Sequence, residues 1–316
     1  MRRPIIIAHH GNPHYLRYTL EQAKHYNNDV ILLGDKKNAV LGNIVEHHLL
    51  DDFSTSEGLS YFRNLYKHMS TNNYQFEKFC LKRWFQILEF IESNSIKSFF
   101  YIDSDVLLYS NISNVLEKVI GDYKAAYNIY IQQYEDYRWT ASAHTSFWKT
   151  EFLRGFCSFV NDSYENGINE LEKKWDWHNE QGINGGICDM SLLYLFYLKN
   201  KNSIYNLLPV SRDIICFDYN INGSLNYKQD EYQTIKSPLG TIMKDIKIRG
   251  EKAYCYNLLN DSDVQFANIH FGGIAKYFCH KFFTINISAV ERLQNSFLSR
   301  WVYLKLKVKT ILKFRN

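Results

Sequence analysis

Residues 99–109 read FFYIDSDVLLY, an apolar run that ends in two carboxylates one residue apart. The run at 99–102 predicts a buried strand, because short continuous apolar segments lie inside parallel sheets. If the chain stays extended beyond this strand, Asp103 and Asp105 point to the same side of it. Two carboxylates on one side form an oxygen-rich site of the kind that binds a divalent cation.

The residues before this stretch predict a strand–helix–strand opening. Short apolar runs at 4–8 and 30–33 predict two strands, and the apolar residues of 15–26 recur with helical spacing. A strong helix is predicted at 76–91, directly before the strand at 99–102. We therefore expect an open α/β sheet with a Rossmann-like first half, whose ligands bind at the strand ends.

Later elements follow from the same patterns. Helices are expected at 111–120 and 189–198, and strands at 125–130, 206–210, 214–217 and 265–271.

A second polar element follows the late strand at 265–271. Residues 269–276 read IHFGGIAK, with a histidine at the strand end, two glycines and then a lysine. The imidazole of His270 can complete a metal shell, and Gly273 allows the backbone to approach a phosphate closely. Lys276 supplies a compact positive charge for phosphate.

These groups suit a diphosphate leaving group. A cation that bridges the phosphate oxygens of a nucleotide-sugar donor neutralises the charge that builds up as the sugar departs. The chain also contains a second Asp-Ser-Asp at 261–263, which follows Leu259 and Asn260. We expect this copy to be a polar turn, so that only the first copy ends a buried strand.

The two segments together resemble the GT-A glycosyltransferases, in which an apolar strand ends in Asp-x-Asp. The later segment is similar to the His-Phe-x-Gly-x-x-Lys motif of glycosyltransferase family 8, a retaining family, and the residues that match it are His270, Phe271, Gly273 and Lys276. The family usually continues Lys-Pro-Trp, whereas this chain continues with Tyr277 and Phe278. The order of elements resembles the GT-A core as far as about Lys276, although the motifs themselves cover few residues.

The resemblance implies a GT-A domain over 1–288, a mixed sheet flanked by helices. It also implies a nucleotide-sugar donor, in particular a UDP-sugar, and a Mn²⁺ or Mg²⁺ ion held by Asp103, Asp105 and His270. A mixed shell of two carboxylates and one imidazole favours Mn²⁺, because Mg²⁺ prefers oxygen ligands.

By the same resemblance, the donor is expected near the first strand ends and the two motifs. The candidate donor-binding residues are Ala8, His9, Asp35, Arg83, Ser104, Gly273 and Lys276. Two alternatives stay open, since His9 could belong to a polar turn and Arg83 could simply pair with Asp105 or its neighbours.

Asp189 is the candidate catalytic residue. In an inverting enzyme it would act as the base on the acceptor hydroxyl, whereas in a retaining enzyme it would orient the donor sugar. The alternative is a plain helix N-cap. The candidate acceptor residues are Trp177, His178, Asn184, Gly185 and Gly186, where 175–178 is expected to lie in an irregular polar stretch or in a lid packed by its own tryptophans.

Composition limits the other classes of function. The chain has 316 residues, 46% of them hydrophobic, and its formal net charge of +4 is too small to indicate nucleic-acid binding. Its six cysteines show no Cys-x-x-Cys spacing, which predicts free thiols in a reducing compartment. No apolar run approaches the ~18 residues of a membrane span. We therefore expect a cytoplasmic protein.

The C-terminal segment 289–316 predicts a basic amphipathic helix. Its apolar stripe consists of Leu293, Phe297, Trp301, Leu304, Val308 and Ile311. Six basic residues and no acidic ones lie in 300–316, so the rest of the chain sums to about −2 (4 − 6). This pattern is typical of peripheral binding to the cytosolic face of an anionic membrane, although such a helix could instead pack on the domain.

The sequence thus predicts a metal-dependent glycosyltransferase that acts on a glycan or a lipid-linked glycan. One alternative is a nucleotidyltransferase of related fold, which usually has a glycine-rich basic loop after its first strand. The other is a non-catalytic sugar-binding or membrane-adaptor protein, which would need no diphosphate site.

Overall fold

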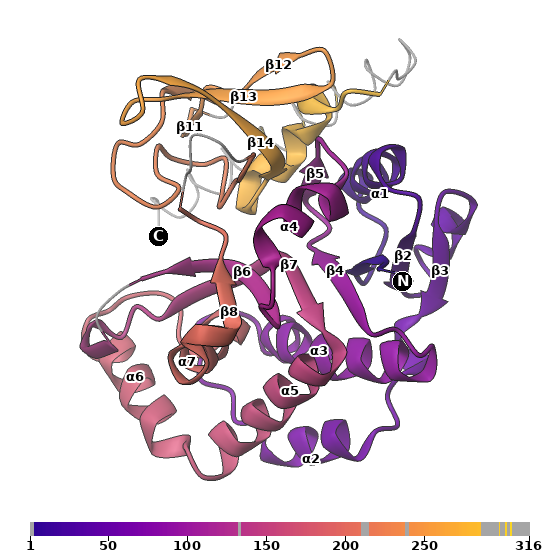
Figure 1. Cartoon of the computed structure of the whole chain (residues 1–316). Helices are drawn as coiled ribbons and strands as arrows, with labels where there is room; N and C mark the ends of the chain where they lie inside the picture. The colour runs from indigo at the N-terminus through magenta and orange to yellow at the C-terminus, as the bar shows by residue number, and fades with distance from the viewer. Residues whose placement is uncertain are drawn as a thin grey trace. The chain divides into compact units, whose positions relative to one another are not determined.

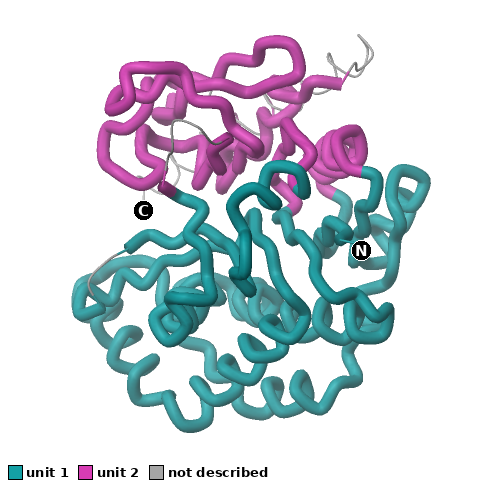
Figure 2. Tube along the Cα trace, viewed as in Figure 1, with its two compact units in different colours: residues 1–12, 28–103, 113–208 teal, residues 13–27, 104–112, 209–316 magenta. Residues whose placement is uncertain are grey.

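The structure is a computed structural model that describes residues 3–131, 134–209, 215–237 and 240–285, together with residues 297, 301 and 304. The chain divides into two compact units, which Figure 2 shows in different colours. Unit 1 comprises 1–12, 28–103 and 113–208, and unit 2 comprises 13–27, 104–112 and 209–316.

Unit 1 is built on a seven-stranded mixed sheet in the order β3-β2-β1-β4-β7-β6-β8 (Figure 1). Its strands are β1 (Ile5–Ala8), β2 (Val30–Gly34), β3 (Glu46–Leu49), β4 (Ser98–Ile102), β6 (Ala125–Tyr130), β7 (Thr140–Lys149) and β8 (Ile204–Asn206). The first four strands of this order run parallel, and β7 is antiparallel to both β4 and β6. β1, β2 and β4 are buried throughout, which explains their continuous apolar sequence.

Helices flank this sheet. They are α2 (Glu57–Leu65), α3 (Tyr74–Ser93), α4 (Ile112–Ile120), α5 (Thr150–Glu165), α6 (Ile168–Glu180) and α7 (Asp189–Lys199). The core joins aromatic side chains of α3, α5 and α7 to β7, with Trp84 and Trp148 fully buried. Asn73 caps α3 by accepting from the backbone N–H groups of Gln75 and Phe76. The predicted mixed α/β sheet flanked by helices is confirmed.

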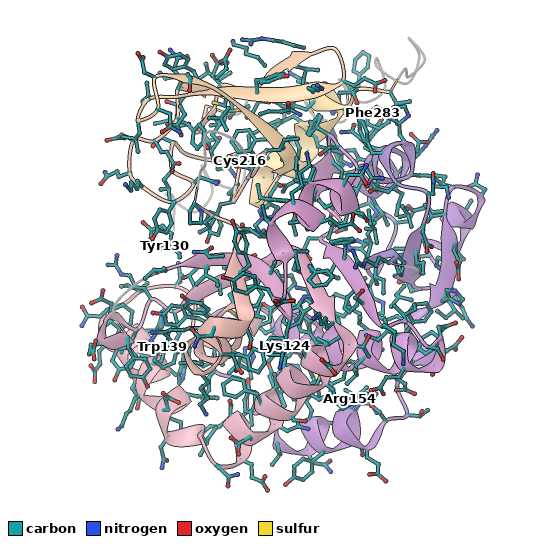
Figure 3. All side chains as sticks on the ribbon, in the orientation of Figure 1. Lys124, Tyr130, Trp139, Arg154, Cys216 and Phe283 are labelled. Atoms are coloured by element: carbon teal, nitrogen blue, oxygen red, sulfur yellow. The ribbon has the colours of Figure 1, made fainter. Side chains whose placement is uncertain are left out.

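Unit 2 has its own sheet in the order β12-β13-β14-β5, with β9 added beside β14. The strands are β5 (Val106–Leu108), β9 (Cys216–Phe217), β12 (Lys247–Arg249), β13 (Lys252–Asn257) and β14 (Ser262–His270), and β10 (Thr234–Lys236) pairs separately with β11 (Ile242–Lys244). The helix α1 (His14–Tyr26) and the 3-10 helix η5 (Gly273–Phe282) pack on each other, and α1 also packs on β5. Figure 3 labels one buried side chain in each unit, Trp139 and Cys216.

Several predicted elements need correction. Trp175 to His178 lie inside α6, so the expected irregular stretch is wrong. The late strand begins at Ser262, so only Asp261 of the second Asp-Ser-Asp lies in a turn. The strand predicted at 206–210 lies earlier, as β8, and the one predicted at 214–217 is reduced to β9; positions 210 and 214 are outside the described residues.

The predicted tail helix at 289–316, with its boundary at 288, lies outside the described residues apart from three positions. These are Phe297, Trp301 and Leu304, whose side chains are exposed. Among the residues that the structure describes, no helix combines the length and apolar character needed to cross a bilayer. The six cysteines are free thiols, as predicted.

Candidate functional site

Polar residues of unit 1 gather where three parallel strands end. β1, β2 and β4 end at Ala8, Gly34 and Ile102, and their parallel pairing places these ends at one edge of the sheet. The residues that follow include His9, Asp35 and Asp103. This is the edge at which open α/β sheets bind ligands.

Asp35 holds the loop around the first two strand ends. Its carboxylate accepts hydrogen bonds from the backbone N–H groups of Gly11, Lys37 and Asn38 at 2.8, 2.9 and 3.2 Å. Burial opposes its ionisation, but these three donors hold the pKa of Asp35 below its ordinary value. The backbone of His9 is fixed as well, because its N–H donates to the carbonyl of Leu33 in β2.

Arg83 on α3 bridges two carboxylates at the end of β4. One guanidinium nitrogen lies 2.9 Å from Asp103 Oδ1, and the other lies 2.8 Å from Asp189 Oδ2. The hydroxyl of Tyr101 donates to the same Asp103 oxygen at 2.7 Å. Burial disfavours the charge on Arg83, but the Tyr101 hydroxyl and the two carboxylates together raise the pKa of the guanidinium above its ordinary value.

Asp189 is the first residue of α7, and Cys188 occupies the capping position. The N-cap alternative for Asp189 is therefore wrong, since its carboxylate faces Arg83 and the indole N–H of Trp84. Burial raises the pKa of Asp189, with Arg83 opposing the rise and Asp103 adding to it.

In unit 2, Asp105 faces a lysine and a histidine. Lys276 Nζ lies 3.1 Å from Asp105 Oδ2, and His270 Nε2 lies 3.6 Å from Asp105 Oδ1. The backbone carbonyl of Asp105 also accepts from the N–H of Phe271 at 2.9 Å, which aligns the start of β5 with the end of β14. The pairing of β5 with β14 therefore brings the two sequence motifs together.

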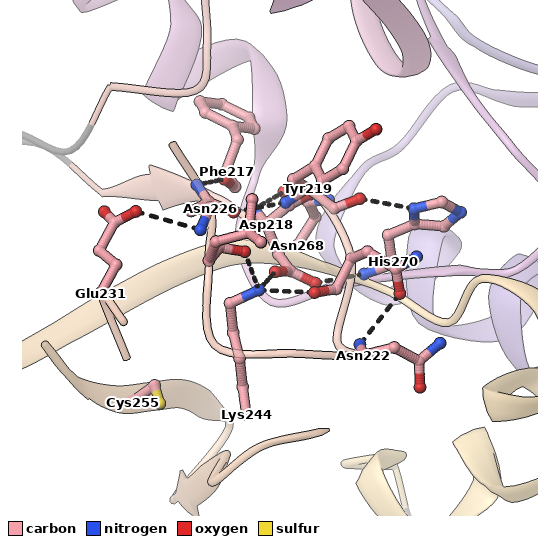
Figure 4. Close-up of polar contacts among 12 residues, drawn as sticks. Phe217, Asp218, Tyr219, Asn222, Asn226, Glu231, Lys244, Cys255, Asn268 and His270 are labelled. Atoms are coloured by element: carbon pink, nitrogen blue, oxygen red, sulfur yellow. Dashed lines mark hydrogen bonds and ion pairs between the residues drawn. The ribbon is translucent and has the colours of Figure 1, made fainter. Parts of the chain in front are cut away.

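His270 has a defined orientation. Its Nδ1 faces the carbonyl oxygen of Tyr219 (Figure 4), and the two atoms are 2.7 Å apart. The opposite nitrogen, Nε2, faces Asp105 at a separation too long for a hydrogen bond. That separation suits two ligands of one ion, each at about 2.0–2.2 Å from it.

Asp103, Asp105 and His270 form a candidate metal site. Each offers one ligand atom, and the three atoms lie within 4.8 Å of one another. Asp103 is the last residue of unit 1, but only Ser104 separates it from Asp105 in the chain. Two carboxylates and one imidazole are ligand types that divalent cations bind in proteins.

Asp103 and Asp105 lie close together for a different reason than the one predicted from the sequence. Ser104 and Asp105 lie in a turn between β4 and β5, so the chain is not extended across Asp-Ser-Asp. Ser104 is buried, and its carbonyl accepts from the hydroxyl of Thr19 at 2.7 Å. A turn fixed by α1 therefore sets the position of Asp105.

Different structural constraints explain the candidate glycines Gly273, Gly185 and Gly186. Gly273 has a φ of +60°, and a Cβ there would meet no atom within 4 Å, so the backbone conformation alone explains this glycine. A Cβ on Gly186, in contrast, would lie 2.2 Å from the carbonyl oxygen of Met69. Gly185 donates its N–H to the hydroxyl of Thr71. The Gly-Gly pair thus lets two stretches of backbone approach each other.

The predicted acceptor residues Trp177 and His178 lie on α6. His178 Nε2 lies 3.0 Å from Nζ of Lys174, and its Nδ1 faces the carbonyl of Ile183, one residue before the candidate Asn184. The Lys174 ammonium also lies over the ring of Trp139, 5.4 Å from its centroid. His178 is therefore buried against a cation rather than presented on a loop.

Sequence reasoning missed three groups of this site. Tyr101 supports Asp103, and Asp218 and Lys244 form a buried ion pair behind His270. A signal for Asp218 exists in the sequence, because it directly follows a short apolar strand, as Asp103 does. Lys244 carries no comparable signal.

Similar proteins are found among solved structures. No family model matches the sequence, and no curated protein matches it. Structural neighbours of the chain include GT-A glycosyltransferases at low sequence identity. Mouse xyloside xylosyltransferase 1 is 10% identical, with a TM-score of 0.47 over 65% of this chain and 84% of that one.

Two further solved structures have lower TM-scores. The galactosyltransferase LgtC, in complex with donor and acceptor sugar analogs, is 14% identical with a TM-score of 0.33 over 64% of this chain and 72% of that one. A cytidylyltransferase from Leptospira borgpetersenii is 13% identical with a TM-score of 0.32 over 55% of this chain and 71% of that one. Likenesses this weak do not choose between the two activities.

Proposed function

We propose that this protein is a metal-dependent glycosyltransferase that moves a sugar from a nucleotide-sugar donor, in particular a UDP-sugar, to a glycan or lipid-linked glycan. The observation that carries the proposal is the group Asp103, Asp105 and His270, with the ammonium of Lys276 beside it. A hard cation and a lysine next to each other suit a diphosphate, which carries negative charge on both phosphates.

Asp103, Asp105 and His270 would hold the ion, and the mixed ligand set favours Mn²⁺ over Mg²⁺. When bound, the ion would neutralise the charge that develops on the leaving diphosphate. Lys276, which now neutralises Asp105, would be released toward a phosphate oxygen when a cation takes over that carboxylate. Gly273, close in sequence to both His270 and Lys276, leaves room for the phosphates to approach the backbone.

Asp189 and Arg83 would serve the sugar. Arg83 fixes the Asp189 carboxylate by a 2.8 Å ion pair, which leaves its remaining lone pairs to accept from hydroxyl groups. In an inverting reaction, Asp189 would take the proton of the acceptor hydroxyl while that oxygen bonds to the anomeric carbon and the bond to the diphosphate breaks. In a retaining reaction, it would orient the donor sugar.

The remaining candidate residues complete this assignment. Ala8, His9 and Asp35 would lie near the nucleotide, and Ser104 would support the turn that carries Asp105. Trp177, with its half-buried ring, would offer a stacking surface to an acceptor sugar. The Gly185–Gly186 pair and Asn184 would shape the same region from the chain that leads into α7.

The two alternatives have less support. A nucleotidyltransferase would usually carry a glycine-rich basic loop after β1, where residues 9–15 read HHGNPHY. A sugar-binding adaptor would not need the cation-binding group together with Lys276. A panel of nucleotide-sugar substrates distinguishes both from the proposed activity.

The basic segment 300–316 would hold the enzyme on an anionic membrane, where a lipid-linked acceptor is found. It carries six positive charges and no negative ones. Phe297, Trp301 and Leu304 expose large apolar side chains just before and within it.

The proposed activity is tested by incubating the full chain with UDP-, GDP- and CMP-sugars, with and without Mn²⁺, and measuring release of the nucleotide. We expect Mn²⁺-dependent hydrolysis of one nucleotide-sugar class, with UDP-sugars favoured. Formation of pyrophosphate from a nucleoside triphosphate and a sugar phosphate would instead establish the nucleotidyltransferase. Binding of sugars without any turnover would favour the adaptor.

A further inference from the structure

The imidazole of His270 is held at two points by one loop of unit 2. Its Nδ1 lies 2.7 Å from the carbonyl oxygen of Tyr219 (Figure 4). A carbonyl can only accept, so Nδ1 carries the proton and Nε2 presents its lone pair. The backbone N–H of His270 donates to Asp218 Oδ2 at 3.0 Å. Two consecutive residues of the loop therefore set both the position and the tautomer of His270.

A buried ion pair closes this loop. Lys244 Nζ lies 2.9 Å from Asp218 Oδ1, and both side chains are 0% exposed. The same ammonium donates to the carbonyl oxygens of Asn220 at 2.5 Å and Leu225 at 3.1 Å. The ammonium is therefore held in the loop by one ion pair and two hydrogen bonds.

Asparagine side chains complete the network. Asn268, two residues before His270 on β14, accepts from the N–H of Asp218 at 3.1 Å and donates to its carbonyl at 3.4 Å. Asn226 accepts from the N–H of Tyr219 at 2.7 Å. This hydrogen bond fixes the backbone of Tyr219, and with it the Tyr219 carbonyl that faces His270.

Stability alone does not explain this arrangement. A buried ion pair gains little over well-packed apolar residues, because both charges lose their hydration. What a fully bonded buried network does provide is a single geometry. Groups behind a metal-binding histidine commonly fix its ring orientation and raise the affinity for the metal.

We propose that the buried Asp218–Lys244 ion pair and the Tyr219 carbonyl are a positioning shell, which fixes the His270 tautomer and aims Nε2 toward Asp105. This inference rests on the metal site of the proposed function. All of these residues belong to unit 2, so the shell forms within one compact unit. Asp218, Tyr219 and Lys244 are positioning residues and would not touch the metal or the donor.

The test uses the full chain and Mn²⁺ alone. The main variant is the double substitution Asp218→Asn/Lys244→Met, which removes both charges and keeps an oxygen to accept from the His270 N–H. The matched control is Asp245→Asn/Lys247→Met, because that ion pair has the same chemistry at 2.8 Å but its lysine is 56% exposed. His270→Ala serves as the reference for loss of a ligand.

Two measurements apply to each folded variant. Mn²⁺ titration followed by electron paramagnetic resonance gives the dissociation constant, and ¹⁵N spectra of histidine-labelled protein give the His270 tautomer in the absence of metal. We expect the double variant to bind Mn²⁺ roughly 10–100-fold more weakly and to lose the single Nδ1–H tautomer. The control pair should change the dissociation constant by less than about twofold, as expected for exposed pairs.

The outcomes separate the two proposals. If His270→Ala weakens Mn²⁺ binding but the folded double variant binds as the unchanged protein does and keeps the tautomer, the positioning shell is refuted and the metal site stands. If His270→Ala leaves Mn²⁺ affinity unchanged, the proposed metal site fails and the inference fails with it. The single variant Lys244→Met, which removes the ammonium but keeps the buried Asp218 carboxylate, should weaken binding at least as much as the double variant.

Discussion

Asp105 is the carboxylate that His270 and Lys276 both approach, so the site depends on its charge. The substitution Asp105→Asn keeps the size of the side chain and removes the charge. We expect Mn²⁺-dependent hydrolysis of the donor to fall by about 100-fold, since a metal ligand supports several kcal/mol of charge stabilisation. The measurement is the rate of nucleotide release at saturating Mn²⁺.

The second Asp-Ser-Asp provides the control for this prediction. Asp261 has a φ of 51°, a conformation that asparagine adopts readily, so Asp261→Asn should leave the fold and the rate nearly unchanged. Equal losses in the two variants would mean that the wrong copy of the motif has been assigned to the metal.

Arg83 pairs with the buried carboxylate of Asp189 and with the half-buried carboxylate of Asp103. The substitution Arg83→Met removes the guanidinium from the buried Asp189 carboxylate, so the free energy of unfolding should fall by about 3–5 kcal/mol. Urea denaturation measures this change. Arg154→Met is the matched control, because Arg154 pairs with Glu92 but is 58% exposed, and its loss should cost less than about 1 kcal/mol. Similar losses at both positions would show that the Arg83 cluster is open to solvent.

The residues around Arg83 show which parts of the site can be predicted from the sequence and which cannot. The Asp-Ser-Asp at 103–105 can be recognised in the sequence because two carboxylates directly follow a run of apolar residues. The partners of Arg83 were not predictable, since Asp189 is 106 positions away and nothing local pairs them. Which carboxylate an arginine meets is decided by the packing of α3 against α7.

At the scale of elements, the segment leading into α7 must approach another backbone. Gly186 has a φ of +138°, and a Cβ there would lie 2.2 Å from the Met69 carbonyl oxygen. We expect Gly186→Ala to lower the free energy of unfolding by about 2 kcal/mol or more. Gly155→Ala, on the exposed side of α5 with open space at its Cβ, should instead raise it by about 0.5–1 kcal/mol. Urea denaturation curves that shift in the same direction for both would contradict this reading of Gly186.

Helix α6 carries a buried lysine whose effect depends on pH. Burial lowers the pKa of Lys174 from 10.5 to about 8, with Cys188 opposing the shift, and His178 lies beside the ammonium. Between about pH 8 and 10.5 the unfolded chain therefore holds more protons than the folded chain, so stability should rise with pH across this window. Relative to Lys174→Met, the unchanged protein should gain up to about 3 kcal/mol.

The measurement for Lys174 is the free energy of unfolding of both proteins at several pH values. Taking the difference between them removes the contribution of the many other groups that titrate in this range. Parallel pH curves for the two proteins would show that the Lys174 ammonium is as well solvated in the folded chain as in the unfolded one.

The elements that sequence predicted and those it missed differ in a physical way. β1, β2 and β4 were predictable because strands buried on both faces must be apolar throughout. β7 was missed because its residues include small and polar side chains, such as Ser142 and His144, whose polar atoms bond to each other inside the sheet. α6 was mistaken for a loop because only Leu171, Lys174 and His178 of its residues are buried, and two of these are polar.

At the scale of the whole molecule, the order of the predicted strands says more about the fold than any single motif does. The parallel neighbours β2, β1 and β4 follow from the strand–helix–strand opening, whereas the sheet of unit 2 is predicted only in part, through β9 and β14. β12 has exposed charged residues and pairs with β13, which in turn pairs with β14. The loop behind His270 belongs to this unpredicted part, which is why its role emerges from the structure.

Charge is distributed unevenly over the whole chain. The segment 300–316 carries six positive charges and no negative ones, while the rest sums to about −2 (4 − 6). Without this segment, an anionic membrane would repel the protein. Each basic residue near such a surface contributes roughly 1 kcal/mol, and salt reduces this contribution. Trp301, 55% exposed, adds apolar burial that salt does not screen.

We therefore expect deletion of 297–316 to abolish binding to anionic vesicles while donor hydrolysis in solution continues at its usual rate. Co-sedimentation with vesicles of phosphatidylserine and phosphatidylcholine, at low and high salt, measures binding. Trp301→Ala should weaken binding at both salt concentrations, whereas replacing Lys305 and Lys307 by glutamine should weaken it mainly at low salt. If the truncated protein sediments like the full chain, the segment does not bind lipid. If truncation unfolds the protein, the apolar stripe belongs to the core of unit 2, and the boundary predicted at 288 is wrong.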